Sequence, residues 1–176
     1  AAQIALGIAP GAGGRSFGFQ RLKNFRLELW KDLLDAAQDA EKPVAFAQIY
    51  GSDLSPVAVR AALANLDRAG LLPAISLSPG DVLEIDAPAA SGVLVANPPS
   101  GERLSEQDEL AAFYPPLGAA LKRKFAGWHC YLLTADLRLP KLMRLAPSKK
   151  TPLFNGAIEC RLFEFAMVAG SNRKAD

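Results

Sequence analysis

The residues whose types and spacing could do chemistry are Asn97, Pro98, Pro99 and Ser100, which directly follow the apolar run 93–96. Four apolar residues closed by a double proline are typical of a buried central strand of a parallel sheet, and ligands of such sheets bind beyond the carboxyl ends of the strands. Proline has no N–H, so the carbonyl oxygens of this turn are left to accept hydrogen bonds from a ligand, and the asparagine amide adds an acceptor and a donor. The cluster therefore suits a planar group with an exocyclic –NH2. The simpler interpretation is a rigid turn that leaves a strand.

Asp53 is a second residue with candidate chemistry. It follows the apolar run 44–50 and precedes a helix whose start is indicated by Ser55 as the N-cap and Pro56 at the first helical position. In nucleotide-binding α/β folds, a carboxylate at such a strand–helix junction accepts hydrogen bonds from ribose hydroxyls. The alternative is a helix-capping aspartate on a solvated turn.

The elements that must position these residues alternate between strands and helices. Pro115 and Pro116 divide the helical region 105–125 into two predicted helices, since proline disfavours a helical conformation at the residue before it. The order predicts an α/β fold with a mostly parallel sheet and a C-terminal antiparallel hairpin. Periodicity, caps and breakers predict strands at 44–50, 74–78, 93–96 and 128–134, helices at 1–8, 27–41, 56–69, 105–113, 115–125 and 137–145, and a hairpin of 152–154 with 157–167 joined by Asn155-Gly156.

Composition places the chain among ordinary globular proteins. Its 176 residues carry a formal net charge of +2, 50% are hydrophobic and 22% are charged, so charge alone does not indicate a nucleic-acid partner. We expect one domain over residues 1–170, followed by a solvated tail over 171–176. No apolar run reaches the ~18 residues of a membrane span, and no signal peptide is recognisable. These features predict a soluble, cytoplasmic protein with no membrane partner.

Cysteine and histidine usage disfavours a metal centre. Cys130 and Cys160 both fall in apolar, strand-like runs, which favours buried, reduced thiols over a disulfide or a metal pair. His129 is the single histidine, so a histidine-based metal site is not expected. Its place in a strand between Trp128 and Cys130 favours a core side chain over a catalytic one.

The stretch NPPSGERL at residues 97–104 carries a resemblance to known enzymes. Asn-Pro-Pro resembles the (D/N)PP(Y/F/W) signature of amino-group methyltransferases that use S-adenosylmethionine. Together with GWHCYLLTAD at 127–136 and FNGAIEC at 154–160, it resembles the RlmL-like family that methylates guanine in large-subunit ribosomal RNA, whose members are often labelled N6-adenine-specific DNA methylases. The resemblance runs from IALGIAPG near the start to IECRLFEF near the end. Proteins of the resembling family run one helix through the region of Pro115 and Pro116, so the resemblance implies a local kink there as the alternative to two helices. Ser100 departs from it, because the family signature has an aromatic residue there.

The resemblance implies a fold, a cofactor and a partner. The fold is the Rossmann-like methyltransferase sheet, the cofactor is S-adenosylmethionine, and the partner is ribosomal RNA. Asn97 and the Pro98 carbonyl would accept the two N–H bonds of the target amine, with Asn97 also bordering the cofactor. An acid after the 74–78 strand would accept a hydrogen bond from the cofactor's adenine amine, and spacing favours Asp81 over Asp86.

The aromatic ring missing at Ser100 would normally stack on the flipped-out base. Phe17, Phe19 and Tyr114 are candidates to replace it. The phenylalanines at 17, 19 and 25 fit either a surface aromatic patch for bases or, more simply, the anchoring of an irregular segment in the core.

The family fold opens with a strand, a glycine-rich turn and then a helix. Because the chain resembles the family only from inside that helix, we expect upstream residues to be missing. The absent strand would lie in mid-sheet, between the strands that end at Asp53 and Asn97, and an RNA-binding THUMP domain would precede it. Two alternatives stay open beside RNA methylation, namely methylation of adenine in DNA and a degenerate, non-catalytic RNA-binding domain.

Overall fold

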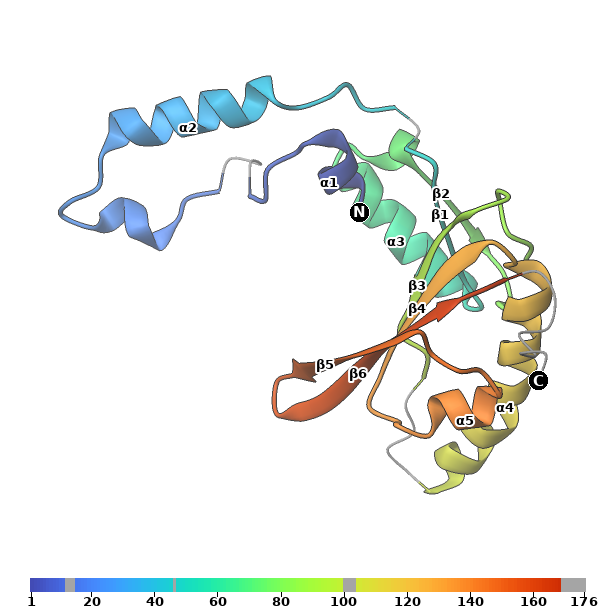
Figure 1. Cartoon of the computed structure of the whole chain (residues 1–176). Coiled ribbons are helices and arrows are strands. Elements are labelled where there is room, and N and C mark those ends of the chain that lie inside the picture. Colours follow the sequence, from blue (N-terminus) through green and yellow to red (C-terminus); the bar gives the residue numbers. More distant parts are fainter. Residues whose placement is uncertain (12–14, 46, 100–103, 169–176) are drawn as a thin grey trace. The chain divides into compact units, whose positions relative to one another are not determined.

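The computed structural model describes residues 1–11, 15–45, 47–99 and 104–168 (Figure 1). It divides into two compact units, Ala1–Pro79 and Gly80–Asp176, and each is considered by itself. The predicted tail over 171–176 lies outside the described residues, and the single domain over 1–170 stays a prediction. Both units combine helices with strands, as the α/β expectation requires.

The first unit contains a parallel pair of strands joined by a helix. Strand β1 (Ile49–Asp53) pairs in parallel with β2 (Ile75–Pro79), and the crossover between them contains α3 (Pro56–Arg68). Helix α3 ends at Arg68 with Ala69 as its C-cap, and Gly70 follows in the left-handed conformation with φ of 66°. Two further helices precede the pair, α1 (Ala2–Leu6) and α2 (Leu27–Asp39), and a short 3-10 turn (Leu72–Ala74) precedes β2. A small core holds Ala2, Leu6, Leu71 and Ala74.

Strand β1 begins later than the sequence predicts. The apolar run was expected to be extended from residue 44, but the strand starts at Ile49 and continues through Gly51 to Asp53. Gln48 has a positive φ of 52°, a left-handed conformation that interrupts an extended chain. Val44, the first residue of the apolar run, is 44% exposed, so this part of the run does not form a buried strand.

The aromatic side chains near the N-terminus pack on each other. Phe17 and Phe19 stack with ring centroids 5.4 Å apart, and Trp30 of α2 meets Phe19 edge-on at 5.1 Å. Phe25 lies 6.0 Å from Phe19. The cluster anchors the irregular segment on α2, and the Phe19 ring is still 42% exposed.

The second unit is built on a four-stranded mixed sheet. Its strands are β3 (Gly92–Ala96), β4 (Trp128–Thr134), β5 (Lys149–Asn155) and β6 (Ile158–Ala166), in the order β3-β4-β6-β5. β3 runs parallel to β4, and the other two contacts are antiparallel. The predicted hairpin is confirmed, with its turn one residue later than expected: Asn155 pairs with Ile158, so the loop residues are Gly156, with φ of 63°, and Ala157.

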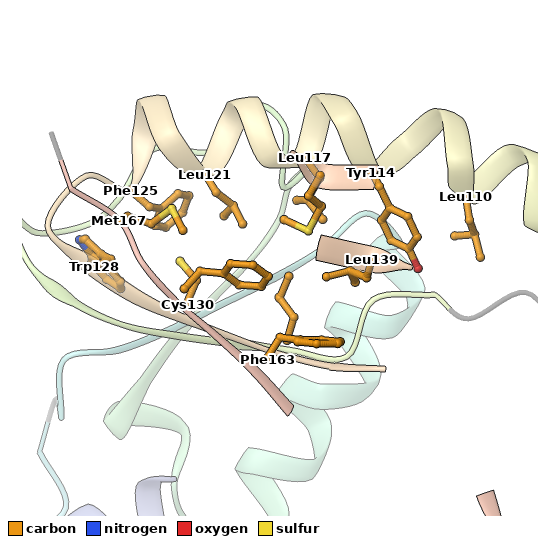
Figure 2. Packing of buried hydrophobic residues seen from close by; sticks show 13 residues of the cluster. Leu110, Tyr114, Leu117, Leu121, Phe125, Trp128, Cys130, Leu139, Phe163 and Met167 are labelled. Atoms are coloured by element: carbon orange, nitrogen blue, oxygen red, sulfur yellow. The ribbon is translucent and has the colours of Figure 1, made fainter. Parts of the chain in front are cut away.

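Helices α4 (Leu104–Lys124) and α5 (Leu139–Met143) pack on one face of this sheet. Figure 2 shows the helical side chains meeting those of the strands. The opposite face of β3 is open: Val93 and Val95 are 63% and 72% exposed. Within the described residues β3 pairs only with β4, and β1 only with β2, so each of these two strands has one unpaired edge, and the central position of β3 stays a prediction. The core comprises Leu110, Tyr114, Leu117, Leu121, Phe125, Trp128, Cys130, Leu132, Leu139, Met143, Phe163, Phe165 and Met167.

Helix α4 is continuous, and the predicted division at its double proline is wrong. Pro115 and Pro116 lie inside it. Each proline removes one N–H donor from the helical ladder, but Tyr114 and Leu117 on either side are buried in the core. Apolar burial over the whole helix therefore outweighs the local loss. The helix already includes Leu104, one residue before the predicted start at 105.

The sequence expectations for the cysteines, Cys130 in β4 and Cys160 in β6, and for His129 in β4 have different outcomes. Cys130 and Cys160 are free and buried, as predicted. His129 is not a core residue: its side chain is 54% exposed, and Nδ1 lies 3.2 Å from Glu164 Oε1. The alternation of β4 explains both, because Trp128 and Cys130 face the helices while His129 faces the open side.

Gly118 is predicted to be irreplaceable in α4. A Cβ at this position would collide with the Met143 carbonyl oxygen at the end of α5. Gly118→Ala should therefore lower the free energy of unfolding by about 1–3 kcal/mol, the usual result of overpacking. Denaturant titration checks this, with Gly18→Ala as the control because no atom lies within 4 Å of a Cβ built there. Equal stability of the two variants would contradict the close approach of α4 and α5.

Cys130 is predicted to be inert in the folded protein. Burial raises the pKa of its thiol to about 11, and the thiolate is the reactive form. At about pH 8, near the ordinary thiol pKa, iodoacetamide should leave Cys130 unmodified until urea unfolds the chain. Because the unfolded thiol loses its proton first, this group should also lower stability as pH rises from the ordinary 9.0 towards 11. Rapid modification of Cys130 without denaturant would show that the α4–sheet core opens.

Candidate functional site

The Asn97-Pro98-Pro99 turn stands at the carboxyl end of β3. Gly92 pairs with Trp128 and Ala96 with Leu132, so β3 and β4 run in the same direction up to this turn. Asn97 and Pro99 are exposed, and Pro98 is buried. Ser100, together with Glu102 and Arg103, lies outside the described residues. The turn thus presents the Asn97 amide to solvent at the edge where parallel sheets bind ligands.

Tyr114 of α4 holds this turn from the inside. Its hydroxyl donates a hydrogen bond to the Pro99 carbonyl oxygen at 3.2 Å, and the side chain is fully buried. Burial, reinforced by the nearby charge of Asp136, raises the pKa of the phenol, so it stays protonated and remains a donor. The suggestion that Tyr114 replaces the missing aromatic ring as a base-stacking surface is therefore wrong, since a fully buried ring has no face to offer.

Three polar side chains at and just after the end of β4 form a cluster beside Tyr114, namely Thr134, Asp136 and Arg138. Thr134 lies close enough to Tyr114 to lower the pKa of the phenol, against the larger effect of burial, and Thr134 Oγ1 accepts from the Asp136 backbone N–H at 3.0 Å. Arg138 donates to both Asp136 carboxylate oxygens at 3.0 Å. These hydrogen bonds lower the pKa of Asp136. Sequence reasoning did not connect Thr134 or Asp136 with the Asn-Pro-Pro turn, because these residues lie far from it along the chain.

Asp53 is the last residue of β1 and is exposed. Its Oδ1 accepts the backbone N–H of Ser55 at 2.8 Å, and Ser55 Oγ in turn accepts from Ala58 N at 3.3 Å as the N-cap of α3. The predicted cap at Ser55 is confirmed. The carboxylate thus makes a local turn contact through one oxygen, and its exposure leaves room for a ligand contact through the other.

Asp81 and Asp86 differ in what they already bind. Asp81 is half-buried, and its Oδ1 accepts the Leu83 N–H at 2.8 Å. Asp86 is exposed and forms an ion pair with Lys124 Nζ at 3.0 Å. Because Asp86 is tied to the last turn of α4, Asp81 is the better candidate for binding a ligand beyond β2.

Neither a metal-binding cluster nor a membrane-spanning helix is found in the described part of the chain. Among residues 1–11, 15–45, 47–99 and 104–168, no three His, Cys, Asp or Glu side chains are grouped so that they could hold a metal ion. Within the same ranges, no helix has the length and apolar character needed to cross a membrane.

Comparison with protein families identifies the chain. The model of the family described as UPF0020, RMKL-like, methyltransferase domain, matches residues 1–164. The chain belongs to this family. Its membership agrees with the resemblance seen in the Asn97-Pro98-Pro99 turn and in the C-terminal hairpin.

Curated relatives share the family and are much longer. A ribosomal RNA large subunit methyltransferase K/L of Shewanella frigidimarina is 34% identical over 99% of this chain and 25% of its own length. The protein of the same name from Methylococcus capsulatus is 39% identical over 93% of this chain and 22% of its own. The chain therefore spans about a quarter of the length of the curated relatives it matches.

Solved structures share the fold. SMU.472, crystallised with SAH, superposes with a TM-score of 0.86 at 25% identity, covering 97% of this chain and 45% of the other. A predicted N6-adenine-specific DNA methylase from Listeria monocytogenes gives 0.80 at 27%, covering 93% and 42%. The fold is the Rossmann-like methyltransferase fold, as the sequence predicts.

Proposed function

We propose that this chain is part of an enzyme that transfers a methyl group from S-adenosylmethionine to the exocyclic amine of a nucleobase, with guanine in large-subunit ribosomal RNA as the acceptor. The observation that carries the proposal is the Asn97-Pro98-Pro99 turn, with its exposed amide at the carboxyl end of β3. The family, the names of the relatives and the SAH in SMU.472 support the reaction class and the RNA acceptor.

The turn can increase the low nucleophilicity of the target amine. An exocyclic amine is a poor nucleophile because its lone pair is delocalised into the ring. Asn97 Oδ1 and the Pro98 carbonyl would each accept one N–H, which favours a tetrahedral nitrogen and directs its lone pair away from the ring. When bound, S-adenosylmethionine would supply the methyl group from its cationic sulfur, and the methylated amine would release one proton to solvent. The residues contribute chiefly by positioning and by fixed dipoles.

Two carboxylates fit the cofactor's polar groups. Asp53 is exposed at the end of β1, with one oxygen in the turn to α3, which suits hydrogen bonds from ribose hydroxyls. Asp81 accepts one backbone N–H and has a second oxygen to accept the adenine amine. Asn97 would border both the cofactor and the acceptor base.

Adenine in DNA is the second candidate acceptor. The name of the Listeria structure favours it, and the same two acceptors would bind an adenine amine equally well. A non-catalytic RNA-binding domain is the third, because Ser100 stands where the family signature has an aromatic residue. Loss of one stacking contact would weaken base binding by about 1–3 kcal/mol. Phe19 has a partly exposed ring and therefore remains a candidate to replace the missing aromatic residue.

Asn97→Ala is predicted to separate transfer from cofactor binding. The substitution removes one acceptor for the target amine, so methyl transfer by the full-length protein should fall by at least roughly a hundredfold. The affinity for S-adenosylmethionine, measured by calorimetry, should change little. Asn65→Ala, an exposed asparagine on α3, is the matched control. If Asn97→Ala loses the cofactor instead, the assigned role is wrong.

Asp81 and Asp86, which follow β2 in the sequence, are predicted to contribute differently to cofactor binding. Asp81→Asn keeps an oxygen for the Leu83 N–H but removes the charge, so the dissociation constant for S-adenosylmethionine should rise by roughly tenfold, as expected for a weakened charge-assisted hydrogen bond. Asp86→Asn breaks only the exposed pair with Lys124 and should leave that constant unchanged. Calorimetric titration distinguishes them, and the reverse pattern would exchange their roles.

A further inference from the structure

The turn after β3 cannot be fixed by its own backbone in the usual way. Pro98 and Pro99 have no N–H to donate. Within the described residues, none of the backbone-to-backbone hydrogen bonds outside regular elements involves residues 97–99. A contact from elsewhere in the unit can therefore help to fix the two acceptors of this turn.

That contact comes from the core of the second unit. The Tyr114 hydroxyl donates to the Pro99 carbonyl at 3.2 Å, and its ring is fully buried. Figure 2 shows Tyr114 between Leu110 and Leu117 along α4, with its hydroxyl directed away from the helix. A side chain packed in this way has little rotational freedom, so its hydroxyl is a fixed point for the turn.

The hydroxyl is itself oriented by a chain of hydrogen bonds. The Asp136 N–H donates to Thr134 Oγ1 at 3.0 Å, Thr134 interacts with the Tyr114 oxygen, and Tyr114 donates to Pro99. Thr134 is only 2% exposed. Because Thr134 Oγ1 already accepts the Asp136 N–H, the Thr134 hydroxyl proton is left to point toward Tyr114, and the Tyr114 proton is left for Pro99.

We propose that Tyr114 is a positioning residue for methyl transfer, oriented by Thr134. By engaging the Pro99 carbonyl it fixes the peptide after the second proline and leaves Asn97 Oδ1 and the Pro98 carbonyl as the pair of acceptors for the target amine. The inference rests on the proposed function. Tyr114 would therefore contact the turn from the core and would not stack on the base.

The direct test is Tyr114→Phe, which keeps the ring in the core and removes the hydroxyl. In the full-length protein, kcat for methyl transfer to RNA should fall by roughly ten- to a hundredfold, the range expected when reacting groups are misplaced. KM for RNA and the dissociation constant for S-adenosylmethionine should each stay within about twofold, since neither ligand contacts the hydroxyl. A variant affected only in stability would not show this selective loss of kcat.

Two further variants complete the comparison. Thr134→Val removes the hydroxyl that orients Tyr114 and keeps the side-chain shape, so kcat should fall less than in Tyr114→Phe. Tyr131→Phe removes the hydroxyl of a half-buried tyrosine on the same strand as Thr134, where the nearby Glu164 contributes to a raised pKa of the phenol. It should leave kcat unchanged.

The outcomes separate this inference from the proposed function. Unchanged kcat in Tyr114→Phe, or loss of cofactor binding in parallel with kcat, would overturn the positioning role. If the unaltered protein methylates no nucleic acid, the proposed function fails, and crystal structures then decide the inference. A displaced Pro98-Pro99 backbone in Tyr114→Phe would support the inference, and an unmoved one would overturn it.

Discussion

The second unit depends on one constraint: the chain must leave β3 through two prolines that cannot donate hydrogen bonds. The Tyr114 hydroxyl supplies the missing donor. Tyr114 directly precedes the double proline of α4, so the helix must continue through Pro115 and Pro116 for the packing on both sides of this residue to be kept. The buried side chains along α4 therefore stabilise both the helix and the Asn-Pro-Pro turn that Tyr114 contacts.

The candidate polar groups follow the ends of parallel strands. Asp53 ends β1, Asp81 comes two residues after β2, and Asn97 comes directly after β3. Each acid makes a local turn contact that fixes one of its oxygens, with Ser55 or with Leu83. The backbone thus orients these carboxylates before any ligand binds, which reduces the entropy lost on binding.

Much of this arrangement could be predicted from the sequence, where short-range rules decide the structure. The cap at Ser55, the stop at Gly70 and the strand 128–134 follow from local chemistry and are observed. The division at Pro115 failed because the core overrides a local helix breaker, and His129 was misplaced because the strand has one open face. Tyr114 could be named as an aromatic residue but not assigned its partner, since only the tertiary structure brings residues 99 and 114 together.

The most direct test of the account is the identity of the methylated nucleoside. The full-length protein would be incubated with labelled S-adenosylmethionine and either unmodified ribosomal RNA or DNA, and the digested product would be analysed by mass spectrometry. The account predicts a methyl group on the exocyclic amine of guanosine from RNA. A methyl group on a ring nitrogen or a ribose oxygen would contradict the role of the Asn97-Pro98-Pro99 turn, and N6-methyladenine from DNA would contradict the proposed acceptor.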